Sequence, residues 1–352
     1  MHVLITGATS GIGLEAVRRL SEQEHQLTIF CRDASRAALQ LGWLNKPSTV
    51  RIVDLADLKA VDTICNQLVS EGQTFDVGVL NAGLQYAGHR KPRFSAQGIE
   101  LTIAVNHLAH QLIAEKLMDR ISRVVITASE VHNPASKGGR VGQPAGLGTL
   151  DGLRAGVGSS MVDGITPFNA DKAYKDSKLC NLLMGFELSR RKQNHPVVAW
   201  SPGLVIPRSS DGFFRESRRA NPLGQMLFGF VARDLLRFTE RTERAGELLT
   251  SLVLESTETS GFRYLSNSLQ KPGQHRFGPG DLSQEASDSK KAHELWVLSS
   301  ALIKRALERC CLWISLQLKG RVDRTGRCPR RRYGLDRCQC AVAIAHWRRH
   351  GS

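Results

Sequence analysis

The 352-residue sequence predicts a doubly wound α/β domain, in which helices cover both faces of a parallel sheet. Short runs that are almost continuously apolar alternate with helical stretches, as expected for strands that are buried on both faces. A glycine-rich turn joins the first of these runs to the first helix. No run of about 18 apolar residues is present, so no membrane-spanning helix is expected.

The elements follow in chain order from the spacing of the apolar residues and from the turns between them. The expected strands are residues 2–6, 26–30, 50–55, 75–83, 122–129 and 196–203. The expected helices are residues 12–21, 36–44, 58–71, 98–118 and 171–193. Because a helical stretch separates consecutive strands, these strands are expected to run parallel.

Composition divides the chain near residue 304, into a 1–304 domain and a 305–352 tail. The tail holds 12 Lys/Arg against 3 Asp/Glu, so it supplies +9 of the net charge of +15. It also holds five of the eight cysteines. The three in the body are scattered, which favours a reducing compartment over a disulfide framework. We expect this basic, Cys- and Arg-rich tail to be irregular and disordered.

Four residues of the tail are of types that bind zinc, namely Cys338, Cys340, His346 and His350. A single residue between the two cysteines is too short a spacing for the usual zinc finger, and no apolar core surrounds the set. The basic run at 330–332 is a similarly weak signal for nucleic-acid binding. No metal site, nucleic-acid partner or other function is therefore assigned to the tail.

The first candidate site is the turn after the first strand, which reads TGATSGIG from Thr6 to Gly13. A dinucleotide pyrophosphate needs backbone that can approach closely and a helix N-terminus whose free N–H groups face the anion. Glycines between an apolar strand and a helix meet both needs, although a tight structural turn is the alternative. The candidate cofactor ligands in this turn are Gly7, Ser10, Gly11, Ile12 and Gly13.

Residues after the second and third strands bear on the choice of cofactor. The acidic residue that would bind a ribose 2′-hydroxyl is absent after the second strand, where Arg32 could pair with a 2′-phosphate instead. This favours NADPH over NADH, unless Arg32 is only a surface residue beside Asp33. Asp54 and Leu55, at the end of the third strand, are placed to meet the adenine. Asp54 could equally be a cap for the next helix.

Further polar positions follow in an order that suits proton transfer. Asn81-Ala82-Gly83 follows the fourth apolar run, Asn106 lies in the next helical stretch, and Ser129 ends the fifth strand. Tyr174 and Lys178 lie four residues apart and so share one face of a helix. The Lys178 ammonium would lower the pKa of the phenol and hydrogen-bond the cofactor ribose, which makes the phenol a usable proton donor near neutral pH. A Tyr-x-x-x-Lys pair alone occurs often by chance, but not together with all of these features in this order.

The words TGATSGIG and NAG, with Asn106, Ser129 and Tyr174-x-x-x-Lys178, resemble the motifs of the short-chain dehydrogenase/reductase family over roughly residues 2–300. The resemblance implies a Rossmann-type domain and a bound nicotinamide cofactor, with Asn81, Ala82 and Gly83 among its ligands. Tyr174 would be the proton donor, and Lys178 its activator and a ribose ligand. Ser129 would help to orient the reacting group, and Asn106 would support a water-linked proton relay.

A narrower resemblance rests on the 45 residues from Ser129 to Tyr174, where common members of the family have about a dozen. The words GLGTLDGL and SSMVDGITPFNADKAYKDSKLCN are similar to those of the light-dependent protochlorophyllide reductases of the family. So are FFRES at 213–217 and LSQEASDSKKAHELW at 282–296, and the latter lies outside any cofactor motif. The resemblance implies a step of chlorophyll biosynthesis. In this step one C=C bond of protochlorophyllide is reduced in the light, with a hydride from NADPH and a proton from Tyr174.

One word departs from that branch of the family. The chain reads Ser201-Pro202-Gly203-Leu204 where the branch has Tyr-Pro-Gly-Cys, whose Tyr and Cys are linked to pigment binding and turnover. Pro202 and Gly203 match and are carried over as cofactor-binding residues. Two alternatives therefore stay open: an NADPH-dependent carbonyl reductase or dehydrogenase acting on another large apolar substrate, such as a retinoid-like or steroid-like alcohol, and a non-catalytic pigment-binding protein. The retained Tyr174 and Lys178 count against the second.

The resemblance also bears on location and partners. No targeting segment is recognisable before the first strand, so a cytoplasmic protein of the cyanobacterial type is expected. Members of the branch associate loosely with photosynthetic membranes and can oligomerise, which makes peripheral membrane contact and a homo-oligomer expectations for this chain. The apolar stretch 221–238 suits a lid over an apolar ligand or a surface that touches a membrane, and equally a plain core helix.

Overall fold

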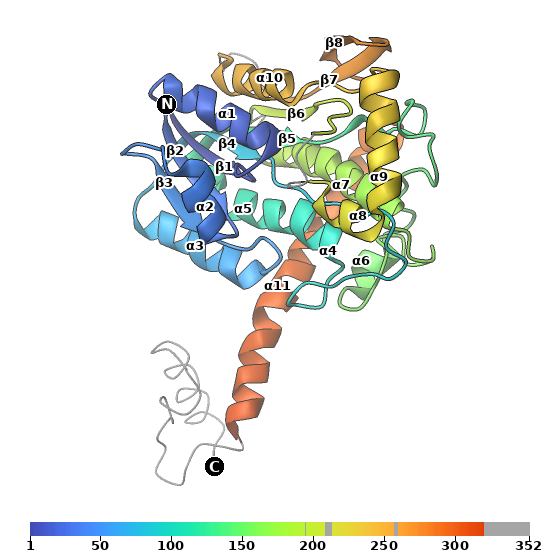
Figure 1. Cartoon of the computed structure of the whole chain (residues 1–352). Coiled ribbons are helices and arrows are strands. Elements are labelled where there is room, and N and C mark those ends of the chain that lie inside the picture. Colours follow the sequence, from blue (N-terminus) through green and yellow to red (C-terminus); the bar gives the residue numbers. More distant parts are fainter. Residues whose placement is uncertain (194, 208–212, 257–259, 320–352) are drawn as a thin grey trace. The chain divides into compact units, whose positions relative to one another are not determined.

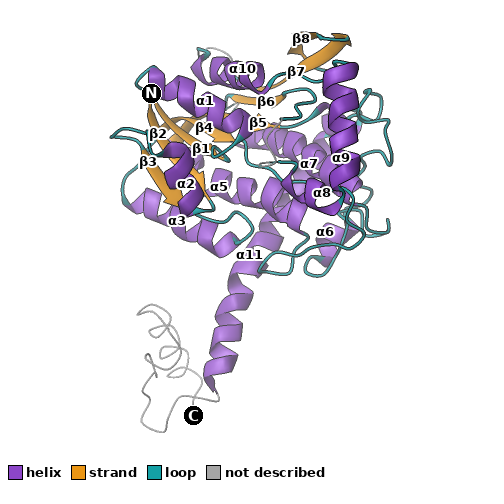
Figure 2. Ribbon diagram, viewed as in Figure 1, coloured by secondary structure: helices purple, strands orange, loops and turns teal. Residues whose placement is uncertain are grey.

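The chain folds around one eight-stranded sheet, with the strand order β3-β2-β1-β4-β5-β6-β7-β8 (Figures 1 and 2). The structure is a computed structural model that describes residues 1–193, 195–207, 213–256 and 260–319, with side chains as far as residue 308. The bounds of the strands are β1 His2–Thr6, β2 Gln26–Cys31, β3 Thr49–Ile52, β4 Phe75–Leu80, β5 Ile121–Thr127, β6 Val197–Ser201, β7 Phe262–Lys271 and β8 Gln274–Pro279.

Neighbouring strands from β3 to β7 all pair in parallel, which confirms the predicted doubly wound α/β class. The last strand differs, because β8 runs antiparallel to β7. A tight turn joins these two strands, and Gly273 in that turn has a φ of +74°. Neither strand was expected from the sequence, since polar residues occupy much of both and no helix separates them.

Helices cover both faces of the sheet (Figure 1). On one face α1 and α10 pack together, and their apolar side chains form a core with β1 and β2 that includes the fully buried Leu20, Ile29 and Leu249. On the other face lie α3, α5 and α7. The bounds of these helices are α1 Gly11–Glu22, α3 Leu58–Ser70, α5 Ala109–Leu117, α7 Ala170–Arg191 and α10 Thr242–Leu254.

Shorter elements connect this framework. Helix α2 (Ala34–Leu41) follows β2, and α6 (Asp151–Ala155) lies in the long segment between β5 and α7. The single helix expected at 98–118 is divided into α4 (Leu101–Ile103), a π-helical turn (Ala104–Leu108) and α5. A π-helical turn gives the backbone one extra residue per turn and often marks a functional site.

After β6 come α8 (Arg215–Ala220), α9 (Pro222–Gly229) and a second π-helical turn (Phe230–Leu235). This segment includes the apolar stretch 221–238. The interpretation of that stretch as a plain core helix is wrong, because Leu223 and Met226 are 74% and 69% exposed. Within the part of the chain that the structure describes, no helix is long and apolar enough to cross a membrane.

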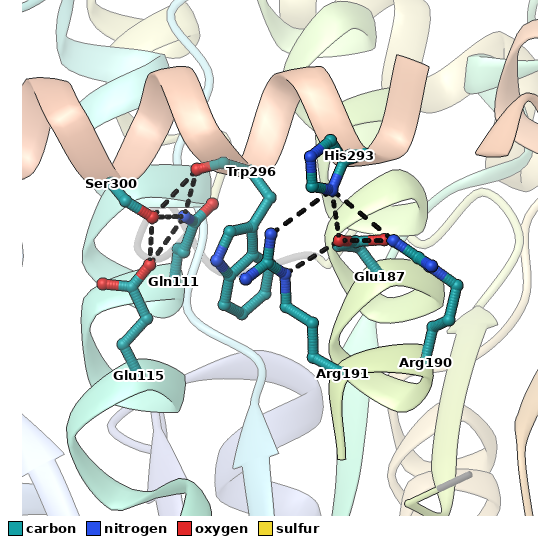
Figure 3. Close-up of polar contacts among 8 residues, drawn as sticks. All are labelled: Gln111, Glu115, Glu187, Arg190, Arg191, His293, Trp296 and Ser300. Carbon is teal, nitrogen blue, oxygen red and sulfur yellow. Dashed lines mark hydrogen bonds and ion pairs between the residues drawn. The ribbon is translucent and has the colours of Figure 1, made fainter. Parts of the chain in front are cut away.

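The last described helix, α11 (Ser289–Lys319), begins in the first of two compact units, Met1–Ser300 and Ala301–Ser352. Inside the first unit, α11 is joined to α5 and α7 by polar contacts (Figure 3). Gln111 of α5 donates to the Trp296 carbonyl and to the Ser300 hydroxyl, each over 3.0 Å. Helix α11 includes residues 305–319, so this part of the predicted tail is helical and not irregular. The zinc-type residues and the basic run at 330–332 lie outside the described residues.

Glu187 of α7 is the centre of the second group of contacts in Figure 3. Its carboxylate is fully buried and accepts hydrogen bonds from the guanidinium groups of Arg190 and Arg191, and it lies 3.0 Å from Nδ1 of His293 on α11. Burial alone would raise the pKa of this carboxyl, but the hydrogen bonds from Arg190 and His293 hold it below its ordinary value of 4.5. The ionised form of Glu187 is therefore favoured by folding.

Replacing this carboxylate should make the stability of the protein less dependent on pH. A carboxyl with a depressed folded-state pKa stabilises above its unfolded-state pKa, and the effect is lost as the pH falls through the folded-state value. We expect Glu187→Gln to lower the free energy of unfolding at pH 7 by about 1–3 kcal/mol, and by less below pH 4.5. Urea unfolding at both pH values measures this. Glu294→Gln on α11, which breaks an exposed pair with Arg154, is the matched control and should change little. Equal losses at both pH values would contradict the assignment.

Candidate active site

The glycine turn lies at the carboxyl end of β1, as predicted. Gly7 and Gly11 have φ values of +71° and +56°, a region that side chains rarely adopt. Gly13, in the first turn of α1, has no room for a side chain, since a Cβ there would lie 2.3 Å from the Gly7 carbonyl oxygen and 2.8 Å from Nδ2 of Asn81. The turn and the helix are therefore held closer together than any residue with a side chain would allow.

This turn also fits an anion. Ser10 is the N-cap of α1 but makes no side-chain cap hydrogen bond, so N–H groups of the first helical turn are left without a side-chain cap. The first turn of α1 carries no acidic residue that would repel a phosphate, and Ile12 follows on the same turn. No described atom lies within 4 Å of the place that a Cβ on Gly11 would occupy. A dinucleotide pyrophosphate thus has open backbone and a helix N-terminus to bind.

The second glycine-containing loop is held against the first. Asn81 donates from its amide nitrogen to the carbonyl oxygens of Thr6, over 3.2 Å, and Gly7, over 3.1 Å. The backbone N–H groups of Asn81 and Ala82 both donate to the Thr6 hydroxyl oxygen, over 3.0 and 2.9 Å. A Cβ on Gly83 would lie 3.6 Å from Nζ of Lys178. The predicted NAG residues therefore connect the glycine turn with the predicted catalytic lysine.

The residues predicted to bind the adenosine part of the cofactor follow β2 and β3. Arg32 follows β2 and is exposed, which leaves its guanidinium accessible. Arg36, which the sequence argument missed, donates from Nε to the Thr9 carbonyl over 3.2 Å and so lies directly at the glycine turn. Its position in the first turn of the helix after β2 was the available signal. Asp54 does not cap the next helix, because that role belongs to Asp57.

The predicted catalytic residues meet at the carboxyl ends of β4 and β5. Lys178 is 3% exposed, donates from Nζ to the Thr127 carbonyl over 2.8 Å, and lies 5.7 Å from the centre of the Tyr174 ring. The Ser129 hydroxyl is close enough to the Tyr174 phenol to influence its pKa. On its other side the Tyr174 ring meets Phe213 edge to face, with 5.2 Å between ring centres.

Burial dominates the protonation of this pair. It raises the pKa of Tyr174, an effect that Ser129 partly offsets and that Asp171 increases. Lys178 was expected to lower that pKa, but the pKa is raised instead, because desolvation of the phenolate outweighs the other effects. Burial also lowers the pKa of Lys178 to about 8. The phenol is thus held in its protonated form, as a proton donor must be.

Asn106 occupies the π-helical turn between α4 and α5 and is fully buried. Its side-chain amide donates to the Leu84 carbonyl over 2.9 Å and to the Ser177 hydroxyl over 3.0 Å, and its side-chain oxygen accepts from the Leu84 N–H over 2.8 Å. The Ser177 hydroxyl in turn donates to the Tyr174 carbonyl over 2.7 Å. Ser177 was not predicted, although its place between Tyr174 and Lys178 on one helix was a signal. Asn106 thus braces both the NAG loop and the tyrosine helix.

The long segment between β5 and α7 is anchored to α7 beside Tyr174 and Lys178. Lys172 donates to the Gly146 carbonyl over 2.7 Å and forms ion pairs with Asp163 and Asp176, at 3.1 and 2.6 Å. Lys175 donates to the Gln143 carbonyl over 2.9 Å. These anchors fix the insertion next to Tyr174.

The motif Ser201-Pro202-Gly203-Leu204, which departs from the family pattern, lies at the end of β6. Ser201 is fully buried, and its hydroxyl accepts from the N–H groups of Glu130, over 3.0 Å, and Gly203, over 3.4 Å. Gly203 has a φ of +77°, and a Cβ there would lie 2.6 Å from the Asn267 carbonyl oxygen. The Pro202 carbonyl accepts from the Asn267 side chain over 3.2 Å. Ser201 therefore holds backbone together, while Leu204 is half-buried.

Comparisons with known proteins agree with this geometry. The family profile described as short chain dehydrogenase matches residues 1–142. A protochlorophyllide reductase from Avena sativa is 35% identical over 319 residues, which cover 86% of this chain and 99% of that protein.

Solved structures share the fold. An uncharacterized protein from Mycobacterium paratuberculosis is 25% identical, with a TM-score of 0.62 over 86% of this chain and 93% of that one. An alcohol dehydrogenase from the archaeon Thermococcus sibiricus, complexed with 5-hydroxy-NADP, is 16% identical, with a TM-score of 0.52 over 80% of this chain and 99% of that one. The second likeness shows the arrangement of the elements alone.

Proposed function

Because the chain belongs to the short-chain dehydrogenase/reductase family of NAD(P)-dependent oxidoreductases, we propose that it uses NADPH to reduce protochlorophyllide to chlorophyllide. The observation that carries the proposal is that Tyr174, Ser129 and Lys178 lie together next to the NAG loop, which contacts the glycine turn, in a chain that is similar over 99% of the length of a protochlorophyllide reductase. The light dependence of the step is part of the same proposal.

The choice of NADPH rests on the residues around the adenosine end. No acidic residue stands directly after β2, where Arg32 is exposed, and Arg36 lies at the glycine turn. Guanidinium groups at these two positions suit a 2′-phosphate, which they would bind with charge-assisted hydrogen bonds. Asp54 and Leu55 would then face the adenine, and Pro202 and Gly203 would lie at the nicotinamide end. When bound, NADPH would supply the hydride.

The roles of the remaining residues follow from their contacts. Tyr174 would give its phenol proton to the carbon next to the one that receives the hydride, so that a C=C bond becomes a single bond. Lys178, buried and charged, would stabilise the tyrosinate that is left and hold the ribose. Ser129 would orient the reacting group, and Asn106 would support the relay that returns a proton to Tyr174. The raised pKa of the phenol bears only on Tyr174, whose proton it holds in place.

The test is a dark incubation of the purified protein with NADPH and protochlorophyllide, followed by illumination and absorption spectroscopy. We expect the red band of the pigment to shift to that of chlorophyllide only after illumination and only with NADPH. Conversion in the dark would contradict light dependence. Pigment binding without conversion would favour a non-catalytic binder, and absence of binding would exclude protochlorophyllide as the substrate.

Ser201 and Leu204 favour a second candidate, a reductase or dehydrogenase that acts on another large apolar carbonyl or alcohol. The Ser201 side chain is fully buried and its hydroxyl oxygen accepts two backbone N–H groups, so it is a poor replacement for a phenol that contacts a pigment. Leu204 offers no thiol. If protochlorophyllide is not bound, retinoid-like and steroid-like compounds with NADP(H) are the next substrates to test.

A single substitution should show whether the missing thiol limits pigment turnover. Ser201 is too tightly buried to be enlarged, whereas Leu204 is half-buried and can be shortened. We expect Leu204→Cys to raise the rate of light-dependent conversion by roughly tenfold, the scale of one side chain at a substrate site. Leu204→Ala is the matched control, because it shortens the side chain without adding a thiol. Equal rates in both variants would rule out a role for the thiol.

A further inference from the structure

His110 of α5 is a fully buried histidine that the proposed mechanism does not use. Its Nε2 atom lies 3.1 Å from the hydroxyl oxygen of Thr6, the residue before the glycine turn. Its Nδ1 atom lies 3.0 Å from the backbone carbonyl oxygen of Asn106, in the π-helical turn. One ring therefore touches both the cofactor turn and the turn that carries the predicted relay residue.

The chemistry of the two neighbours fixes the tautomer of this ring. A carbonyl oxygen can only accept, so Nδ1 must carry the proton and donate to Asn106. Burial, with the nearby Lys178 as a further cause, lowers the pKa of His110 to about 3, so the ring is neutral near pH 7 and Nε2 is an acceptor. The Thr6 hydroxyl then donates to Nε2. Its other possible acceptor, the Val79 carbonyl, is more distant at 3.5 Å.

The same hydroxyl completes a directed chain of hydrogen bonds. While it donates to His110, the Thr6 oxygen accepts from the N–H groups of Asn81 and Ala82, over 3.0 and 2.9 Å. The chain thus runs from the NAG loop through Thr6 and His110 to the carbonyl of Asn106. All of its hydrogen bonds run in one direction, and the Thr6 oxygen accepts two of them. In a dry interior, breaking one link leaves a buried polar group without a partner, which is costly.

We propose that His110 is a positioning residue that holds the cofactor turn and the Asn106 turn in a fixed relation. The proposal rests on the proposed function, since it assumes that the glycine turn binds NADPH and that Asn106 serves the proton relay. Through Nε2 and Thr6 the ring holds the position of the cofactor turn, and through Nδ1 it holds the position of Asn106. The two sides can therefore be separated by substitution.

Two amides each reproduce one side of the imidazole. In His110→Asn the amide lies near the place of Nδ1, so it can still donate to the Asn106 carbonyl but no longer reaches Thr6. In His110→Gln the amide oxygen lies near the place of Nε2, so it can still accept from Thr6 but no longer serves Asn106. We expect His110→Asn to raise the Kd for NADPH by about tenfold with little change in kcat, and His110→Gln to lower kcat by about tenfold with little change in Kd.

The control is His107→Asn, in the π-helical turn that also contains Asn106. His107 is also fully buried, but its Nε2 lies 2.9 Å from the Ser299 hydroxyl, away from the site. This variant should lower the Tm by as much as the His110 variants and leave Kd and kcat unchanged. Fluorescence titration with NADPH gives Kd without any substrate.

The outcomes separate the two proposals. A wild-type protein that does not bind NADPH contradicts the proposed function. A wild-type protein that binds NADPH, with His110 variants that lose only stability as His107→Asn does, overturns the role of His110. A ¹⁵N NMR spectrum that shows the proton on Nε2 in place of Nδ1 also overturns it, without any need for turnover.

Discussion

In Tyr174→Phe, kcat should fall by about 10²–10⁴-fold, because the variant lacks the only proton that the proposed mechanism delivers to the substrate. The ring itself remains, so the edge-to-face contact with Phe213 and the packing around Lys178 are kept. Tyr174 is only half-buried, so removal of its hydroxyl should change stability little. The measurements are single-turnover absorption kinetics after illumination, the Kd for NADPH, and the Tm.

The changes in kcat, in the Kd for NADPH and in the Tm together identify the role of Tyr174. A fall in kcat with unchanged Kd and Tm marks an interaction that is made in the transition state. Tyr264→Phe is the control, since it removes another buried phenol from β7 and should leave kcat nearly unchanged. Retention of wild-type turnover by Tyr174→Phe would show that the proton comes from another group.

In Gly13→Ala, NADPH binding should weaken by at least about tenfold and the free energy of unfolding should fall by roughly 1–3 kcal/mol. The added Cβ would lie 2.3 Å from the Gly7 carbonyl oxygen and 2.8 Å from Nδ2 of Asn81, so the backbone of the turn must move. That movement breaks the contact of Asn81 with the Gly7 carbonyl oxygen. The measurements are NADPH titration and urea unfolding.

Gly72→Ala is the matched control for that experiment. Gly72 follows α3, has a φ of +69°, and has no described atom within 4 Å of its would-be Cβ. The substitution should cost about 1 kcal/mol through backbone strain alone and leave the Kd for NADPH unchanged. If Gly13→Ala behaves in the same way, the close approach of the turn and α1 is not needed for the cofactor.

Much of the fold follows from the sequence because its strongest signals are local. The apolar runs and the turn at Gly7–Gly13 predict β1 to β6 in parallel, since each depends on neighbours within a few residues. The β7–β8 pair is not predicted, because its strands contain few apolar residues and because a tight turn, and not a helix, joins them. The division of the expected helix at 98–118 is not predicted either. The π-helical turn depends on contacts with distant parts of the chain, such as those of Asn106 with Leu84 and Ser177.

The residues of the candidate site likewise fall into those that the sequence predicts and those that only the fold reveals. Residue types and spacing predict Tyr174, Lys178 and Asn81, because the chemistry needs those groups in that order. Spacing does not reveal a phenol with a raised pKa, since desolvation depends on what the fold places around it. Nor does it reveal Arg36 at the glycine turn. His110 looks like an ordinary core residue until Thr6, 104 positions earlier, is seen beside it.

The anchors of the long insertion have a consequence for how this lineage can change. Lys172, Lys175 and Asp176 hold the insertion, and they alternate along α7 with Tyr174 and Lys178, to which we assign the chemistry. A substitution in this short stretch therefore affects both the anchoring of the insertion and the proposed chemistry, so we expect few substitutions to be tolerated there. The segment 202–207 follows Ser201 directly and contains Leu204, so both altered residues lie outside this stretch of α7. New substrate preferences are expected to arise in that segment, while the reaction is inherited unchanged.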